Sequence, residues 1–117
     1  MPIRVLIVDD DDAFRRSAAG VLADRGYDVV GHAGTVAEAR AAIHRLDPDA
    51  LLLDVNLPDG NGVVFATELS RDSGRPRILL TSSDPSGVTK RLLERCGASG
   101  FVLKLDLTSA DLRAQLG

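Results

Sequence analysis

Short apolar runs and amphipathic segments alternate along the whole chain. The apolar runs have the length of strands, and we expect strands at residues 3–8, 27–30, 50–53, 78–80 and 101–103. In the segments between and after them, apolar residues recur every three or four positions, as on one face of a helix. The expected helices begin near residues 12, 35, 62, 88 and 108. This alternation predicts five strand–helix units.

Capping residues and turn residues indicate where the helices begin and end. We expect Asp12 to be the N-cap of the first helix. Thr35 and Glu38 have the spacing of a capping box, which opens the second helix. The third helix is expected over about 62–72, after a loop rich in turn residues, and residues 108–111 are expected to start a short fifth helix.

The strands predict an α/β fold with a parallel sheet. Four of them lack polar alternation, which indicates burial on both faces, whereas Asp28 interrupts the second and favours an edge position. Right-handed crossovers then give a doubly wound, flavodoxin-like sheet, whose common strand order for five units is 2-1-3-4-5. Ligands of such sheets bind beyond the carboxyl ends of the strands, between the first and third.

Composition and charge narrow the class of protein. The chain has 117 residues, of which 44% are hydrophobic and 26% charged, so we expect one globular domain over residues 1–117. Its net charge of −3 is unlike that of a nucleic-acid binder, so no direct contact with nucleic acid is expected. Membrane-length apolar runs and a signal peptide are absent from the sequence, which favours a cytoplasmic protein. We expect the lone Cys96 to pack in the core.

Polar residues directly follow four of the expected strands. They are Asp9 and Asp10 after the first strand, Asp54 after the third, Thr81 after the fourth and Lys104 after the fifth. Each has a simple structural explanation on its own, because such residues cap helices, start turns or lie in solvent at strand ends. A doubly wound sheet brings these ends together, however, so we predict one joint site.

Three carboxylates at one sheet edge repel one another unless a cation or a proton intervenes. Oxygen ligands suit Mg²⁺, and His32 and His44 form no pattern typical of a zinc site. An ionised Asp54 beside Mg²⁺, Lys104 and the Thr81 hydroxyl is suited to phosphoryl transfer. The carboxylate would attack phosphorus, the cations would neutralise its oxygens, and the hydroxyl would donate a hydrogen bond.

Four segments resemble the response regulator receiver domain, and the likeness covers essentially the whole chain. They are Val-Asp-Asp at 8–10, Leu-Leu-Leu-Asp-Val-Asn-Leu-Pro-Asp-Gly at 51–60, Leu-Leu-Thr-Ser at 79–82 and Gly-Ala-Ser-Gly-Phe-Val-Leu-Lys at 97–104. The resemblance implies a CheY-like fold and a phosphoacceptor in two-component signal transduction. Asp54 would then receive its phosphoryl group from a sensor histidine kinase.

The resemblance also implies a set of metal ligands. Asp10, Asp54 and the backbone carbonyl of Asn56 would bind Mg²⁺ directly, and Asp9 would help through a water molecule. Lys104 would pair with Asp54 and with the phosphoryl group.

Further roles follow from the same resemblance. Thr81 and Phe101 would form the conformational switch, with Phe101 standing where a tyrosine is more usual. Asn56 and Ser83 would tune dephosphorylation. Leu105 follows the lysine where the family usually has proline, a departure familiar in members with a helix-turn-helix output domain.

The implied organisation is a single receiver domain at the N-terminal part of a longer transcription regulator. Its partners would be a sensor histidine kinase, a C-terminal DNA-binding output domain outside this chain, and a second copy in a homodimer formed on phosphorylation. The domain itself would be no enzyme, with self-phosphorylation and autodephosphorylation as its only chemistry.

Other functions remain as alternatives. A flavodoxin-like carrier would share the fold, but the aspartates at 9–12 would repel the phosphate of its cofactor. An aspartyl-phosphate phosphatase needs an acid/base near its nucleophile, and Asn56 has no carboxylate. A receiver-like interaction module that works without phosphorylation is disfavoured by the intact site residues.

Overall fold

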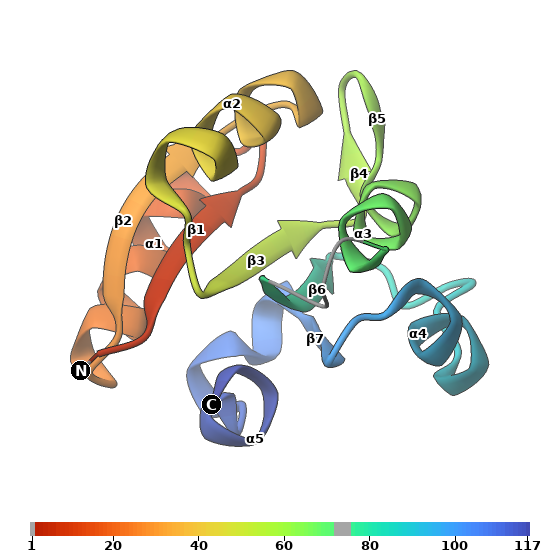
Figure 1. Cartoon of the computed structure of the whole chain (residues 1–117). Coiled ribbons are helices and arrows are strands. Elements are labelled where there is room, and N and C mark those ends of the chain that lie inside the picture. The colour runs from red at the N-terminus through yellow and green to blue at the C-terminus, as the bar shows by residue number, and fades with distance from the viewer. Residues whose placement is uncertain (1, 72–75) are drawn as a thin grey trace.

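Five strands form a single parallel sheet in the computed structural model, which describes residues 2–71 and 76–117 (Figure 1). The strands of this sheet are β1 (Arg4–Val8), β2 (Asp28–Ala33), β3 (Ala50–Asp54), β6 (Arg77–Ser82) and β7 (Gly100–Leu103). Their order is β2-β1-β3-β6-β7, which is the predicted order 2-1-3-4-5 when the strands of this sheet are counted along the chain. The predicted edge position of the strand that contains Asp28 is confirmed.

Helices cover both faces of the sheet. They are α1 (Asp12–Asp24), α2 (Val36–Leu46), α3 (Gly62–Ser70), α4 (Lys90–Cys96) and α5 (Leu112–Leu116), with a 3₁₀ helix, η1 (Lys104–Ser109), between β7 and α5. A two-stranded antiparallel hairpin, β4 (Asn56–Leu57) and β5 (Gly60–Asn61), lies between β3 and α3 (Figure 1). In the two described ranges, no helix combines the length and apolar character that crossing a bilayer requires.

Alternate residues of the central strands build two separate cores. In β1, Leu6 and Val8 pack with α2, α3 and α4, whereas Val5 and Ile7 face α1 and α5. These side chains are fully buried, because parallel strands at the centre of the sheet have helices on both faces. Cys96 is buried in the first of the two cores, as predicted.

Several predicted boundaries were wrong. The second strand continues to Ala33 because its pairing with β1 runs as far as Val8. The N-cap of α1 is Asp11 and not Asp12: Asp11 has extended backbone dihedrals and accepts from the N–H groups of the first turn. Asp12 lies inside that turn, where it pairs with Arg15 and Arg16.

The segment after β7 also differs from its prediction. Residues 104–109 form the 3₁₀ helix η1, and α5 begins only after its N-cap Asp111, so residues 108–111 do not start the last helix. The β4–β5 hairpin was not predicted either. The expected third helix ends at Ser70, and its last predicted residue, Asp72, lies outside the described residues.

Gly62 tests the packing next to the end of β3, and Gly20, in the middle of α1, is its control. Gly20 is exposed in the middle of α1 with no atom within 4 Å of an added Cβ, so Gly20→Ala should stabilise the fold by about 1 kcal/mol. At Gly62 the same atom would lie 2.2 Å from the carbonyl oxygen of Asp54, so Gly62→Ala should destabilise by about 1–3 kcal/mol. Urea denaturation measures both, and equal effects would contradict this packing.

Candidate functional site

Three carboxylates meet at the carboxyl edge of the sheet. Asp9 and Asp10 follow β1, Asp54 ends β3, and one oxygen from each lies within 4.8 Å of the other two. Asp9 and Asp54 are 0% and 4% exposed, whereas Asp10 is exposed to solvent. Parallel pairing of β1 with β3 brings these side chains together, because both strands end at the same edge.

Lys104 provides the positive charge at this cluster. Its Nζ atom lies 2.7 Å from Oδ2 of Asp9 and 3.3 Å from Oδ2 of Asp54. The same Nζ lies 4.7 Å from the centroid of the Phe14 ring, close enough for a cation–π contact. The ammonium group is therefore enclosed by two carboxylates and an aromatic face.

Backbone N–H groups hold the remaining carboxylate oxygens. Oδ1 of Asp9 accepts from the N–H of Asp11 at 2.9 Å, and Oδ1 of Asp54 accepts from the N–H of Asn56 at 3.1 Å. Each buried aspartate thus has one oxygen near Lys104 and the other on the N–H two residues further along the chain. Both carboxylates are fixed in orientation by these paired contacts.

The charges in the site shift two pKa values. Burial raises the pKa of Asp54, and repulsion from Asp9 adds to the rise, while the Asn56 N–H and Lys104 oppose it. Burial alone would lower the pKa of Lys104, but its close contact with Asp9 and the negative charges of Asp54 and Asp9 raise it overall. Without metal, the Asp54 carboxyl is therefore a weaker acid than in water, and the Lys104 ammonium holds its proton more tightly.

Thr81 lies beside Asp54 as its register partner on β6. The side chain is fully buried, and its Oγ1 has no hydrogen-bond partner among the described residues. A buried hydroxyl without a partner costs about 1–3 kcal/mol, so this donor is available to an acceptor that binds at the site. Oδ2 of Asp9 also accepts no hydrogen bond of good geometry among these residues, although it is ion-paired with Lys104.

The other residues named in the sequence analysis belong to β7, to η1 and to the segments that follow β3 and β6. Phe101 pairs with Leu80 across β6 and β7 and is half-buried against the core on the α2, α3 and α4 face. Asn56 and Ser83 are exposed, just beyond the ends of β3 and β6. Leu105, next to Lys104, is 91% exposed on η1.

Two residues at the site were missed by the sequence interpretation. No role was predicted for Phe14, yet its ring contacts Lys104. Arg15 donates a hydrogen bond to the carbonyl oxygen of Asp9. Their place one turn after Asp10 and Asp11 was the available signal, because the first turn of a helix that follows a strand end lies beside that end.

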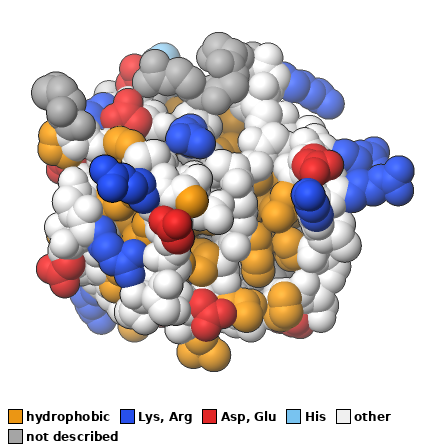
Figure 2. Space-filling model, turned by 90° about the horizontal axis from the view of Figure 1, so that it is seen from below, with side chains coloured by type: hydrophobic (Ala, Val, Ile, Leu, Met, Phe, Trp, Pro, Cys, Tyr) orange, Lys and Arg blue, Asp and Glu red, His pale blue; other side chains and the backbone are white. Residues whose placement is uncertain are grey.

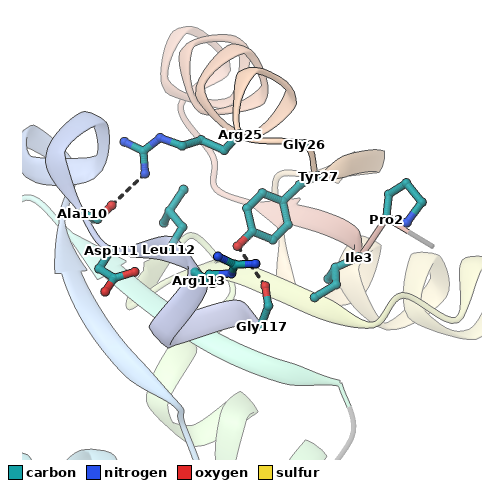
Figure 3. Close-up of a pocket in the computed structure, with 10 residues that line it drawn as sticks. All are labelled: Pro2, Ile3, Arg25, Gly26, Tyr27, Ala110, Asp111, Leu112, Arg113 and Gly117. Atoms are coloured by element: carbon teal, nitrogen blue, oxygen red, sulfur yellow. Dashed lines mark hydrogen bonds between the residues drawn. The ribbon is translucent and has the colours of Figure 1, made fainter.

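The described surface also has two hollows. One, of about 500 Å³, borders the site and is lined by Asn56 of β4, by Ser82 at the end of β6, and by residues of α3 and of the segment after β6. The other, of about 520 Å³, lies before β1 and β2, at the opposite end of these strands (Figure 3). There Arg25 donates to the Ala110 carbonyl and Tyr27 to that of Gly117, so these polar groups are already engaged.

The view from below shows basic and acidic side chains interspersed with hydrophobic ones (Figure 2). No continuous field of one charge covers the described residues of this face. The carboxylates of residues 9, 10 and 54, by contrast, are clustered at the strand ends.

The raised pKa of Asp54 predicts that this carboxylate destabilises the metal-free fold at neutral pH. The folded protein binds the Asp54 proton more tightly than the unfolded chain does. The stability that the protonated carboxyl contributes is fully present below the ordinary pKa of 3.8, and it is lost as the pH rises through the raised pKa of the folded state. Asp54→Asn should therefore raise the free energy of unfolding by about 1 kcal/mol at pH 7 and by less near pH 4. Thermal denaturation with a chelator present measures this. Asp12→Asn, at an exposed ion-paired aspartate, is the control, and an Asp54→Asn midpoint equal to or below wild type at pH 7 would refute the interpretation.

Comparison with known proteins identifies the fold and the family. The sequence model of the response regulator receiver domain matches residues 5–116. A two-component response regulator of the LuxR family from Aurantimonas sp. SI85-9A1 superposes with a TM-score of 0.85 at 26% identity, covering 99% of this chain and 86% of that one.

Curated relatives are longer than this chain. The DNA-binding transcriptional activator DevR/DosR of Mycobacterium tuberculosis is 41% identical over 103 residues, which is 87% of this chain and 48% of that protein. A protein-glutamate methylesterase/protein-glutamine glutaminase of Agrobacterium fabrum is 41% identical over 90 residues, 76% of this chain and 26% of that protein. The part shared by an activator and an esterase is thus a signalling module common to both. The chain belongs to the response regulator receiver domain family of two-component signal transduction.

Proposed function

We propose that Asp54 is the phosphoacceptor of this receiver domain and that a phosphohistidine of a sensor histidine kinase is the donor. The observation that carries the proposal is the setting of the Asp54 carboxylate. One oxygen is held by the Asn56 N–H, the other lies 3.3 Å from the Lys104 ammonium, and an unpartnered Thr81 hydroxyl lies on the neighbouring strand. This combines a nucleophile, a cation and a hydrogen-bond donor at one edge of the sheet.

The proposed transfer requires no general base. An ionised Asp54 oxygen attacks phosphorus, the new O–P bond forms as the P–N bond to the histidine breaks, and the imidazole nitrogen keeps the electron pair. Lys104 neutralises charge on the phosphoryl oxygens, and the Thr81 hydroxyl donates to one of them. The Asn56 N–H keeps the attacking carboxylate oriented throughout.

The residues present fit a bound Mg²⁺ ion. Asp9, Asp10 and Asp54 offer three carboxylate oxygens close together, and the backbone carbonyl of Asn56 would complete the protein ligands. Mg²⁺ held there would supply positive charge to the oxygens of the transferring phosphoryl group. The mutual repulsion of these carboxylates supports a cation, because Lys104 alone leaves a net negative cluster.

Phosphorylation would act on the fold through Thr81. The added oxygens give its buried hydroxyl a charge-assisted hydrogen bond, and its shift toward them would free space beside β7 for Phe101 to turn inward. Asn56 and Ser83 flank Asp54 at exposed positions from which they would tune dephosphorylation. Autodephosphorylation and self-phosphorylation would be the domain's own chemistry.

The proposed setting is the N-terminal receiver of a longer transcription regulator. The relative DevR/DosR, a DNA-binding transcriptional activator, matches over about half of its length and supports a DNA-binding output domain beyond residues 1–117. Phosphorylation would favour a homodimer and so activate that output. The family match leaves a flavodoxin-like carrier without support, and the remaining alternative is an interaction module that needs no phosphorylation.

The central experiment is labelling with a small acyl phosphate. With Mg²⁺ present, intact-mass spectrometry should show one phosphoryl group on the wild type and none on Asp54→Asn. Asp10→Asn should slow labelling and raise the Mg²⁺ requirement, whereas the matched variant Asp12→Asn should match wild type, because Asp12 is engaged by Arg15 and Arg16. A label that survives Asp54→Asn would overturn the assignment, and an unlabelled wild type would favour the phosphorylation-independent module.

A further inference from the structure

We propose that Asp59 is a positioning residue of the site: its carboxylate ties the β4–β5 hairpin to the N-terminus of α2 and thereby sets the place of Asn56 and Asp54. This inference concerns the Mg²⁺ affinity of the site and rests on the proposed function for that consequence. In the sequence, residues 58–60 were interpreted as turn residues and as part of the segment at 51–60 that resembles the receiver domain, and no role in the site was predicted for Asp59.

The contacts of Asp59 bridge two segments far apart in the chain. Its Oδ1 accepts from the N–H of Val36 at 2.7 Å and its Oδ2 from the N–H of Ala37 at 3.1 Å. The Thr35 side chain accepts from the third free N–H of this helix, that of Glu38, at 3.0 Å. The first turn of α2 is therefore capped partly by its own N-cap and partly by the hairpin.

The base of the hairpin lies on the phosphoacceptor strand. The N–H of Asn56 donates to the Asp54 carboxylate, and the N–H of Gly62 donates to the Val55 carbonyl at 2.7 Å. Gly62 is packed so tightly that a Cβ there would collide with the Asp54 carbonyl. Few residues separate this base from Asp59, so fixing the tip of the hairpin restrains the backbone that holds Asp54.

A second link joins α2 to the element that follows the hairpin. The Arg40 guanidinium lies 5.0 Å from the centroid of the Phe65 ring on α3 and forms an ion pair with Glu68. Figure 1 shows the hairpin beside the beginning of α2, with α3 below it. Helix α2 thus contacts the hairpin through its first turn and α3 through Arg40.

The strand that precedes α2 is hydrogen-bonded to Asp9. Strand β2 precedes this helix and ends at Ala33, whose carbonyl accepts from the Asp9 N–H at 2.9 Å. A continuous path therefore runs from Asp9 along β2 and α2, across the hydrogen bonds to the Asp59 carboxylate, and back along the chain to Asp54. We infer that this path sets the spacing of the two buried carboxylates across the switch point of the sheet.

Electrostatics supports the tie. Asp59 is exposed, yet the N–H groups of Val36 and Ala37 hold the pKa of its carboxyl below its ordinary value. A negative charge at a helix N-terminus is also favourable for the helix dipole. A cap that acted only on α2 would stabilise the helix and leave the Mg²⁺ affinity of the carboxylate cluster unchanged. The Mg²⁺ affinity of Asp59 variants therefore distinguishes a simple helix cap from a positioning residue.

The test compares Asp59→Ala with Thr35→Ala, since both remove a capping side chain from α2 and only the first cuts its tie to the hairpin. Calorimetric titration should show Mg²⁺ binding weakened roughly tenfold by Asp59→Ala and unchanged by Thr35→Ala. Asp59→Asn, which keeps one acceptor oxygen, should lie between wild type and Asp59→Ala. Equal weakening in the two alanine variants, or none in Asp59→Ala, would overturn the proposal.

Amide hydrogen exchange without metal gives a readout that does not depend on the proposed function. Exchange in residues 56–61 should become faster in Asp59→Ala and stay as in wild type in Thr35→Ala. Unchanged exchange in Asp59→Ala would overturn the tie itself. A wild type that binds no Mg²⁺ while the hairpin loosens as expected would instead overturn the proposed function and leave the tie as a purely structural one.

Discussion

Asp9 and Asp54 are buried next to each other, and the surrounding residues have to offset the repulsion between their charges. Two carboxylates at 0% and 4% exposure repel one another, and removing a charge from water is costly. Lys104 offsets this by lying within 3.3 Å of both, and its own charge is sheltered by the Phe14 ring. Strand β7, which Lys104 directly follows, therefore has to lie near the strand that ends at Asp54, as the order β3-β6-β7 provides.

The loops after β1 and β3 both stabilise a buried carboxylate with a backbone hydrogen bond. In each loop the N–H group two residues after the aspartate donates to its carboxylate: Asp11 to Asp9, and Asn56 to Asp54. Asp11 also caps α1, so one residue both orients Asp9 and begins the helix that carries Phe14. Local backbone turns thus orient the acids, whereas the distant residues Lys104 and Thr81 supply the charge and the hydroxyl.

The sequence was sufficient for the sheet and for the convergence of its polar strand ends. Buried parallel strands read as continuous apolar runs, and their topology brings residues 9, 54, 81 and 104 to one edge. It was insufficient where contacts join distant segments or where neighbours compete for one role. Asp11 and Asp12 are neighbours of the same residue type, and only the backbone conformation decides which of them caps α1. Asp59 caps α2 although more than 20 residues separate it from Val36 in the sequence. The 3₁₀ helix η1 has no periodicity that separates it from the start of α5.

A double-mutant cycle between Lys104 and Asp54 tests the charge balance most directly. Unfolding free energies of wild type, Lys104→Met, Asp54→Asn and the double variant would be measured in chelator at pH 7. Lys104→Met should be strongly destabilised, because it leaves two buried carboxylates without their cation. Asp54→Asn should then stabilise the Lys104→Met background more than it stabilises wild type. Additive effects of the two substitutions would contradict the account.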